Sequence, residues 1–244
     1  LKNLAIFARK RFEGKVIAIT GSNGKTSTKN MLSSSLNLFG KTHSTFENNN
    51  NFLGLCLTLL RLKKNFEYCV IELGMNKKNE LKRLSKIANP NSIIITNVSS
   101  SHIGNFKSEQ QIAEEKSEIF NGILPNGNII LNADDKWFNF LKHKALQHTK
   151  NVYSFGKKSN SKLKIKNISP YKNGTLLRID DLDLFFKELP LHYVVNVSGV
   201  IVTLNLMQLN YKSILNKVCE FKPAPGRGNN FEIYLSNKGK VTII

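Results

Sequence analysis

Residues 16–27 read Val-Ile-Ala-Ile-Thr-Gly-Ser-Asn-Gly-Lys-Thr-Ser, a β-branched run followed by a short glycine-rich loop and the start of a helical pattern. Glycines let the backbone N–H groups of such a loop turn inward around phosphate oxygens, and the helix that follows adds a positive dipole at its N-terminus. The loop is shorter than the usual phosphate-binding motif, because Ile19 occupies the place of its first glycine. Lys25 can reach the β- and γ-phosphates of a nucleotide, and Thr26 offers a hydroxyl to Mg²⁺. A plain turn is the alternative, but the flanking strand and helix favour nucleotide binding by Gly21, Ser22, Asn23, Gly24, Lys25, Thr26 and Ser27.

The sequence around this loop predicts an α/β fold with a doubly wound, mostly parallel sheet. Four continuous apolar runs have the length of strands, at 16–20, 69–73, 92–96 and 128–132. Continuous rather than alternating apolarity indicates burial on both faces of a sheet. Helical patterns lie between these runs, at 27–39, 53–62, 80–88 and 110–123. Such alternation places ligands at the carboxyl ends of the strands.

The pattern changes after Gly156. Residues 162–168, 176–179 and 182–186 alternate between apolar and polar side chains, and 172–174 form a turn signal, which together predict a small antiparallel β patch. Residues 194–209 and 214–221 then have the pattern of two helices, although the first is rich in β-branched side chains.

Composition limits the classes of protein that this chain can represent. It has 244 residues, 41% of them hydrophobic, which is typical of a globular chain. The net charge of +19 allows a nucleic-acid-binding protein, but the basic residues are scattered along the chain, with no run of five or six like charges. We therefore favour compositional bias together with an anionic small-molecule substrate, and expect no nucleic-acid partner and no insertion into a membrane. The three cysteines are far apart in apolar runs, which indicates buried free thiols in a reducing compartment.

Two polar residues near strand ends are candidate metal ligands. Glu72 ends a predicted buried strand, where a carboxylate is costly unless it is paired with a cation or bound to a metal. A salt bridge to lysine is the ordinary outcome, but the neighbouring phosphate loop favours Mg²⁺. His102 lies in the loop after the strand at 92–96. A lone histidine in a loop is more often a solvated surface group.

Further stretches, in order along nearly the whole chain, resemble the central ATPase domain of the Mur ligases. They are residues 17–26, 48–51 with Gly54 and 58–60, 70–76, 95–97 with His102, 113–120, and 131–134. The asparagine-rich stretch before Gly54 resembles the family member that adds D-alanyl-D-alanine to UDP-N-acetylmuramoyl-tripeptide. The resemblance thus implies two small-molecule substrates, ATP and two Mg²⁺ sites.

The resemblance also implies roles for residues that spacing alone does not assign. The family's matching side chains bind metal at Glu72 and His102 and, after carbamylation, at Lys116. Asn196 matches an asparagine that contacts adenine, although Tyr193 and Leu191 depart from the family pattern around it. Arg227 matches an arginine that approaches the γ-phosphate, while Asn50 and Asn51 match residues on the substrate side. The catalytic set so implied is Lys25, His102, Lys116 and Arg227.

The activity implied is ATP-dependent amide ligation through an acyl phosphate, in peptidoglycan precursor synthesis in a bacterial cytoplasm, by a monomer. We expect residues 1–14 to be the tail of an N-terminal UDP-binding domain, 15–235 the central ATP-binding domain, and 236–244 the start of a C-terminal domain. On that division, the chain alone should bind Mg-ATP weakly and ligate nothing. Three alternatives remain: another Mur-like ligase, including the folylpolyglutamate synthase type; a phosphate-loop module that binds nucleotide without ligating; and a nucleic-acid-binding protein.

Overall fold

Six parallel strands form the central sheet of the computed structural model, which describes residues 1–100, 106–161, 163–187, 191–221, 231–235 and 239–243. Their spatial order is β2-β3-β1-β4-β5-β6. The phosphate-loop strand β1 pairs with β3 on one side and β4 on the other. The strands are β1 (Lys15–Thr20), β2 (Thr42–Ser44), β3 (Tyr68–Glu72), β4 (Ser92–Ile95), β5 (Asn128–Asn132) and β6 (Val152–Phe155).

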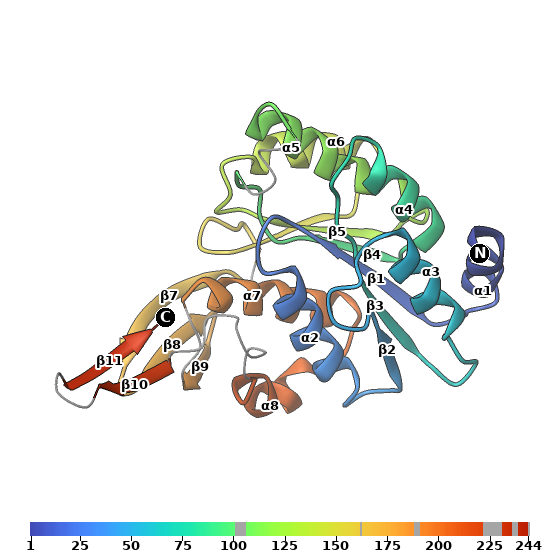
Figure 1. The fold of residues 1–244 in the computed structure, drawn as a ribbon. Helices are drawn as coiled ribbons and strands as arrows, with labels where there is room; N and C mark the ends of the chain where they lie inside the picture. The colour runs from blue at the N-terminus through green and yellow to red at the C-terminus, as the bar shows by residue number, and fades with distance from the viewer. Residues whose placement is uncertain (101–105, 162, 188–190, 222–230, 236–238, 244) are drawn as a thin grey trace.

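Helices cover both faces of this sheet, as its apolar strands require. On one face, α1 (Lys2–Lys10), α3 (Phe52–Leu60), α4 (Glu80–Ala88), α5 (Glu109–Ser117) and α6 (Phe138–Leu146) contribute to one buried apolar cluster. On the other, α2 (Lys25–Leu36), α7 (Leu191–Leu206) and α8 (Leu215–Cys219) contribute to a second cluster. Figure 1 shows these two groups of helices on opposite sides of the sheet. The doubly wound architecture expected from the sequence is therefore confirmed.

A small antiparallel sheet extends the second face. Strands β7 (Ile165–Tyr171), β8 (Gly174–Ile179) and β9 (Leu182–Lys187) pair in sequence order. The first hairpin turns at Lys172, whose φ is +50°, within the turn expected at 172–174. A further antiparallel pair joins β10 (Phe231–Leu235) to β11 (Gly239–Ile243).

Several element boundaries differ from the sequence-based expectation. The helix expected at 110–123 ends at Ser117 and continues as the 3₁₀ turn η1 (Glu118–Gly122). The helix expected at 214–221 is the 3₁₀ turn η2 (Tyr211–Ile214) followed by α8. The sequence analysis also missed β2, β6, α1 and α6. Strands β2 and β6 have only three and four residues and lie at the two edges of the sheet, where burial is incomplete and the apolar signal is weak.

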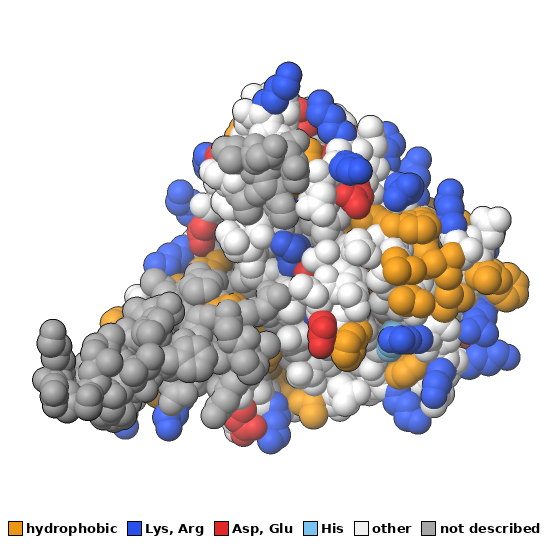
Figure 2. Space-filling view, viewed as in Figure 1, with side chains coloured by type: hydrophobic (Ala, Val, Ile, Leu, Met, Phe, Trp, Pro, Cys, Tyr) orange, Lys and Arg blue, Asp and Glu red, His pale blue; other side chains and the backbone are white. Residues whose placement is uncertain are grey.

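The surface carries dispersed positive charge and, on α1 and α3, exposed apolar side chains. Figure 2 shows lysine and arginine side chains spread around the visible face rather than gathered in one stripe. The exposed large apolar side chains of α1 and α3 are Leu4, Phe7, Leu53 and Leu57. Among the described residues, no helix is both long enough and apolar enough to span a membrane. All three cysteines are free thiols: Cys56 and Cys69 are buried, and Cys219 is half-buried.

Candidate active site

The phosphate loop joins the carboxyl end of β1 to the first turn of α2. Gly21 and Gly24 have φ values of +151° and +77°, a backbone region that side chains rarely adopt. A Cβ atom on Gly21 would overlap the side chain of Thr96, and one on Gly24 would overlap the amide of Asn196. Both glycines are therefore required by conformation and by space, and Asn196 of α7 lies directly against the loop.

Backbone and side-chain hydrogen bonds fix the loop to the segment after β4. The N–H of Ser22 donates to the carbonyl of Asn97 at 2.9 Å, and the N–H of Asn23 donates to Oδ1 of Asn97 at 2.9 Å. The Ser22 hydroxyl accepts from the N–H of Ser99 at 2.9 Å. The hydroxyl of Thr96 also donates to the carbonyl of Asn23 at 2.6 Å, so both residues of the Thr-Asn pair that the family resemblance singles out hold the loop in place.

Lys25 bends back over the loop that precedes it. Its Nζ donates to the carbonyls of Gly21 at 2.8 Å and Ser22 at 2.9 Å. No side chain caps the N-terminus of α2, whose N-cap residue is Gly24. The first N–H groups of the helix, its dipole and the Lys25 ammonium thus share one end of the helix, which suits an anion.

Glu72 lies at the carboxyl end of β3, in register with Ile19 of β1. It is 1% exposed, and its Oε1 accepts a hydrogen bond from Nδ2 of Asn50 at 2.8 Å. Its Oε2 is buried and has no hydrogen-bond partner among the described residues. Burying a carboxylate oxygen without a partner is unfavourable in free energy. Carboxylate oxygens are the ligands that hard divalent cations such as Mg²⁺ prefer. The residue therefore fits the Mg²⁺ that the family resemblance implies.

Lys116 is buried in α5 near the phosphate loop. It is 1% exposed, and burial lowers the pKa of its ammonium to about 7, with the charge of Lys25 acting in the same direction. Its neighbour Glu115 accepts hydrogen bonds from the N–H groups of Asn79 and Leu81, which fastens α5 to the start of α4. Burial therefore favours the neutral amine of Lys116, the form that can react with CO₂.

The two asparagines expected on the substrate side differ in their contacts. Asn51 is the N-cap of α3, and its Oδ1 accepts from the N–H of Gly54 at 2.9 Å. Asn50 instead donates to Glu72 through its side chain, while its carbonyl accepts from the N–H of Gly74 at 2.8 Å. Asn51 thus supports a helix and Asn50 supports the candidate metal ligand, whereas substrate contact by either stays a prediction.

Two of the expected site residues, His102 and Arg227, lie outside the described residues. Within the described parts of the chain, no group of three or more histidine, cysteine, aspartate or glutamate side chains could hold a metal ion. Of the metal ligands expected from the sequence, the described residues include Thr26, at the start of α2, and Glu72, at the end of the neighbouring strand β3.

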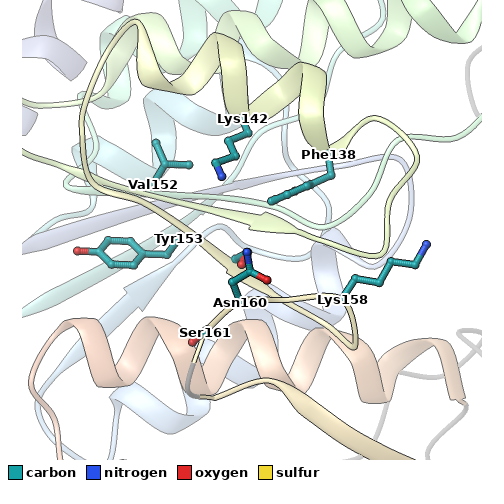
Figure 3. A pocket seen from close by; sticks show the side chains of 8 residues that line it. Phe138, Lys142, Val152, Tyr153, Lys158, Asn160 and Ser161 are labelled. Carbon is teal, nitrogen blue, oxygen red and sulfur yellow. The ribbon is translucent and has the colours of Figure 1, made fainter.

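A cavity of about 500 Å³ opens beside the phosphate loop. Its lining comes from the start of α2 and the segment after β2, and comprises Thr26, Lys29, Asn30 and residues 44–48. A separate cavity of about 240 Å³ lies between α6 and β6, at the far edge of the sheet. Figure 3 shows Phe138 and Lys142 of α6 above Tyr153 of β6 in this second cavity. Neither Phe138 nor Lys142 was expected from the sequence to be functional, and the strand order separates this cavity from the loop.

The sequence analysis missed two residues next to the site. Lys29 is 2% exposed and lies one turn beyond Lys25 and Thr26. Asp135 accepts hydrogen bonds from the N–H groups of Val98 and Trp137, at 2.6 and 2.7 Å, and so fastens the segment after β4 to the segment after β5. Their helix and strand-end positions were available from the sequence, but their partners are backbone groups that no side-chain pattern reveals.

Fold and site together define an α/β domain with a phosphate-type loop and, on the neighbouring strand, a buried carboxylate that has one oxygen without a described partner. Residues 19–208 match the model of the Mur ligase middle domain, and the chain belongs to this family. A UDP-N-acetylmuramoyl-tripeptide–D-alanyl-D-alanine ligase of Buchnera aphidicola subsp. Baizongia pistaciae is 35% identical over 245 residues, which cover 100% of this chain and 53% of that protein. The chain therefore spans about half the length of this curated relative.

Solved structures agree with the family assignment. A crystal structure of MurF from Acinetobacter baumannii superposes with a TM-score of 0.89 at 28% identity, covering 99% of this chain and 53% of that one. The structure of MurF ligase from Thermotoga maritima in complex with ADP gives a TM-score of 0.83 at 26% identity, covering 94% and 54% of the two chains.

Proposed function

We propose that this chain is the ATP-binding part of the ligase that joins D-alanyl-D-alanine to UDP-N-acetylmuramoyl-tripeptide, a step of peptidoglycan precursor synthesis in a bacterial cytoplasm. The observation that supports the proposal is the position of Glu72 on the strand next to the phosphate-loop strand, with its buried Oε2 lacking a hydrogen-bond partner among the described residues. The similarity to relatives with that name selects this ligation step.

The residues of the loop hold and orient the triphosphate. N–H groups at the start of α2 would surround the phosphate oxygens, while those of Ser22 and Asn23 stay bound to Asn97, and Lys25 would turn from the loop carbonyls to the β- and γ-phosphates. Thr26 and Glu72 would hold a first Mg²⁺, and carbamylated Lys116 with His102 would hold a second. Bound there, Mg²⁺ would offset negative charge on the transferring phosphoryl group.

The chemistry proceeds in two displacements. A carboxylate oxygen of the tripeptide attacks the γ-phosphorus of ATP, the bond to the β-phosphate oxygen breaks, and ADP leaves as the acyl phosphate forms. The amine of D-alanyl-D-alanine then attacks the acyl carbon, loses a proton and expels inorganic phosphate. Lys25 and Arg227 stabilise the charge that develops on the transferring oxygens, while Asn196 holds the base of the nucleotide beside Gly24.

A substrate panel tests this function. The protein that carries this chain, supplied with Mg-ATP, should release phosphate and form amide only when UDP-N-acetylmuramoyl-tripeptide and D-alanyl-D-alanine are both present. Turnover with a folate and glutamate instead would assign the chain to the folylpolyglutamate synthase type. Nucleotide binding with no amide product from any pair would contradict the ligase assignment.

A second test addresses the metal. Glu72→Gln keeps the acceptor for Asn50 and removes the charge, so nucleotide binding in the absence of metal should persist while turnover falls by more than about tenfold, or about 1.4 kcal/mol of barrier. Turnover within tenfold of the unmodified protein would contradict the role given to Glu72.

A further inference from the structure

Lys29 is a buried ammonium on the helix that follows the phosphate loop. It is 2% exposed and stands three residues beyond Thr26, so the two side chains share a face of α2 and line the same cavity. Its Nζ donates to the carbonyl of Thr45 at 2.8 Å and to the carbonyl of Glu47 at 2.5 Å. Burying a charge is costly, and these charge-assisted hydrogen bonds compensate for that cost while they hold a backbone segment against α2.

What they hold is the segment between β2 and α3. Glu47 has a φ of +47°, which is uncommon for a residue other than glycine. The carbonyl of Glu47 reaches Lys29 in this conformation. The ammonium therefore compensates for local backbone strain and fastens residues 45–47 to α2.

The same segment fixes both ends of Glu72. The hydroxyl of Thr45 accepts a hydrogen bond from the N–H of Glu72 at 3.0 Å. A few residues later, Nδ2 of Asn50 donates to Oε1 of Glu72 at 2.8 Å. Asn50 is held in turn by its carbonyl, which accepts from the N–H of Gly74. One continuous chain of contacts thus runs from Lys29 through residues 45–50 to the carboxylate.

We propose that Lys29 is a positioning residue that ties the phosphate-binding helix to the Glu72 carboxylate, so that the phosphates and the metal ligand are held in one fixed relation. This inference rests on the proposed function, because it takes Thr26 and Glu72 to hold Mg²⁺. Lys29 itself touches backbone carbonyls rather than substrate, and it acts through Thr45 and Asn50. It differs in this from Lys25, whose ammonium lies at the loop itself.

The measurement is the gain in ATP affinity that Mg²⁺ provides. Calorimetric titration of this chain with ATP, once with Mg²⁺ and once with a chelator, gives that gain as a ratio of two dissociation constants. Lys29→Met keeps the length of the side chain but cannot donate, and we expect it to reduce the ratio at least about fivefold. Metal-free ATP affinity should change less than about twofold. Lys29→Arg, which keeps the charge and the donors, should restore most of the ratio.

Controls separate positioning from folding and from general electrostatics. Lys150→Met removes an exposed lysine far from the loop in sequence and should leave both affinities unchanged. Asn50→Ala should lower the ratio in the same way, and the double variant with Lys29→Met should lose little more than either single change, because both act on Glu72. If Lys29→Met does not fold, Lys29→Gln, which keeps an N–H donor but loses charge and reach, takes its place.

The outcomes distinguish this inference from the proposed function. If the unmodified chain binds no ATP, or binds it with no gain from Mg²⁺, the proposed function fails. If the unmodified chain shows the gain and Lys29→Met keeps it, the positioning role of Lys29 is wrong and the proposed function stands. An equal loss of affinity with and without metal would also overturn the positioning role, because it would indicate only a charge or folding effect.

Discussion

Three ionisable side chains near the phosphate loop, Lys29, Glu72 and Lys116, are at most 2% exposed. Burying a charged group lowers the stability of the fold unless hydrogen-bond or ionic partners compensate for the lost hydration. Proteins retain such destabilising groups where function requires them. Lys29 is compensated by backbone carbonyls, and Glu72 only at one of its two oxygens. Lys116 responds differently, since its pKa falls to about 7.

Replacing Lys116 by methionine should stabilise the fold. The folded-state pKa of about 7 lies below the ordinary 10.5, so between these values the unfolded chain binds more protons and the stability of the unmodified protein rises with pH. The gain from Lys116→Met should therefore be largest below pH 7, with about 5 kcal/mol as an upper limit, and should shrink toward pH 10. Urea unfolding in CO₂-free buffer at pH 6.5, 8 and 9.5 measures it, with Lys150→Met as the control. A gain that does not depend on pH would contradict the lowered pKa.

Lys25→Ala should remove most of the affinity for ATP. The ammonium makes charge-assisted hydrogen bonds, each worth about 1.5–3 kcal/mol, so a loss of at least about tenfold follows when its phosphate contacts disappear. In the structure this ammonium donates to the loop carbonyls of Gly21 and Ser22 at 2.8 and 2.9 Å, and we expect the helix to remain folded without it. Calorimetry and circular dichroism together check both statements. Unchanged affinity would refute the assignment of the phosphate loop.

At the scale of elements, the N-terminus of α3 is capped by a side chain. Asn51 accepts from the N–H of Gly54, and loss of such a cap costs about 1 kcal/mol, within a range of about 0.5–2. Asn51→Ala should therefore lower the free energy of unfolding by that amount, Asn51→Asp should not, and Asn48→Ala, an exposed neighbour, should change little. Denaturant unfolding measures all three. If Asn51→Ala leaves stability unchanged while weakening substrate binding, the side chain acts on substrate rather than on the helix.

Some elements and contacts of this fold could be predicted from the sequence, and others could not. Strands β1, β3, β4 and β5 were predictable because both of their faces are buried, so their apolar runs are continuous. The glycine-rich loop and Glu72 were predictable because their chemistry is local. The bond from Asn50 to Glu72 and those from Lys29 to residues 45 and 47 join segments 16 to 22 positions apart through backbone or amide groups. Such partners have no signature in spacing, and only the folded chain supplies them.

At the scale of the whole molecule, the charge of +19 must be reconciled with a small-molecule site. The cationic side chains lie apart over the face seen in Figure 2, whereas a nucleic-acid surface gathers them along one stripe. A dispersed positive field still favours the approach of anions such as nucleotides and UDP-sugars, and this effect weakens with added salt. The charge and the phosphate loop therefore favour the same class of ligand.

Mg-ATP should stabilise the entire domain, and duplex DNA should not. A ligand that binds only the folded state at 100 times its dissociation constant adds about 2.7 kcal/mol. For a domain of this size that corresponds to a rise in Tm of about 5–11 °C. The loop connects β1, at the centre of the sheet, to α2 on one face, so its nucleotide is linked to global unfolding rather than to local opening. The test compares the Tm of the unmodified chain with Mg-ATP and with duplex DNA, at equal phosphate concentration in about 150 mM salt. The same two measurements are made on Lys25→Ala. A rise in Tm with DNA that matches or exceeds the rise with Mg-ATP, and that disappears in high salt, would favour a nucleic-acid-binding protein. A rise in Tm with Mg-ATP that Lys25→Ala abolishes would place the stabilising ligand in the phosphate loop.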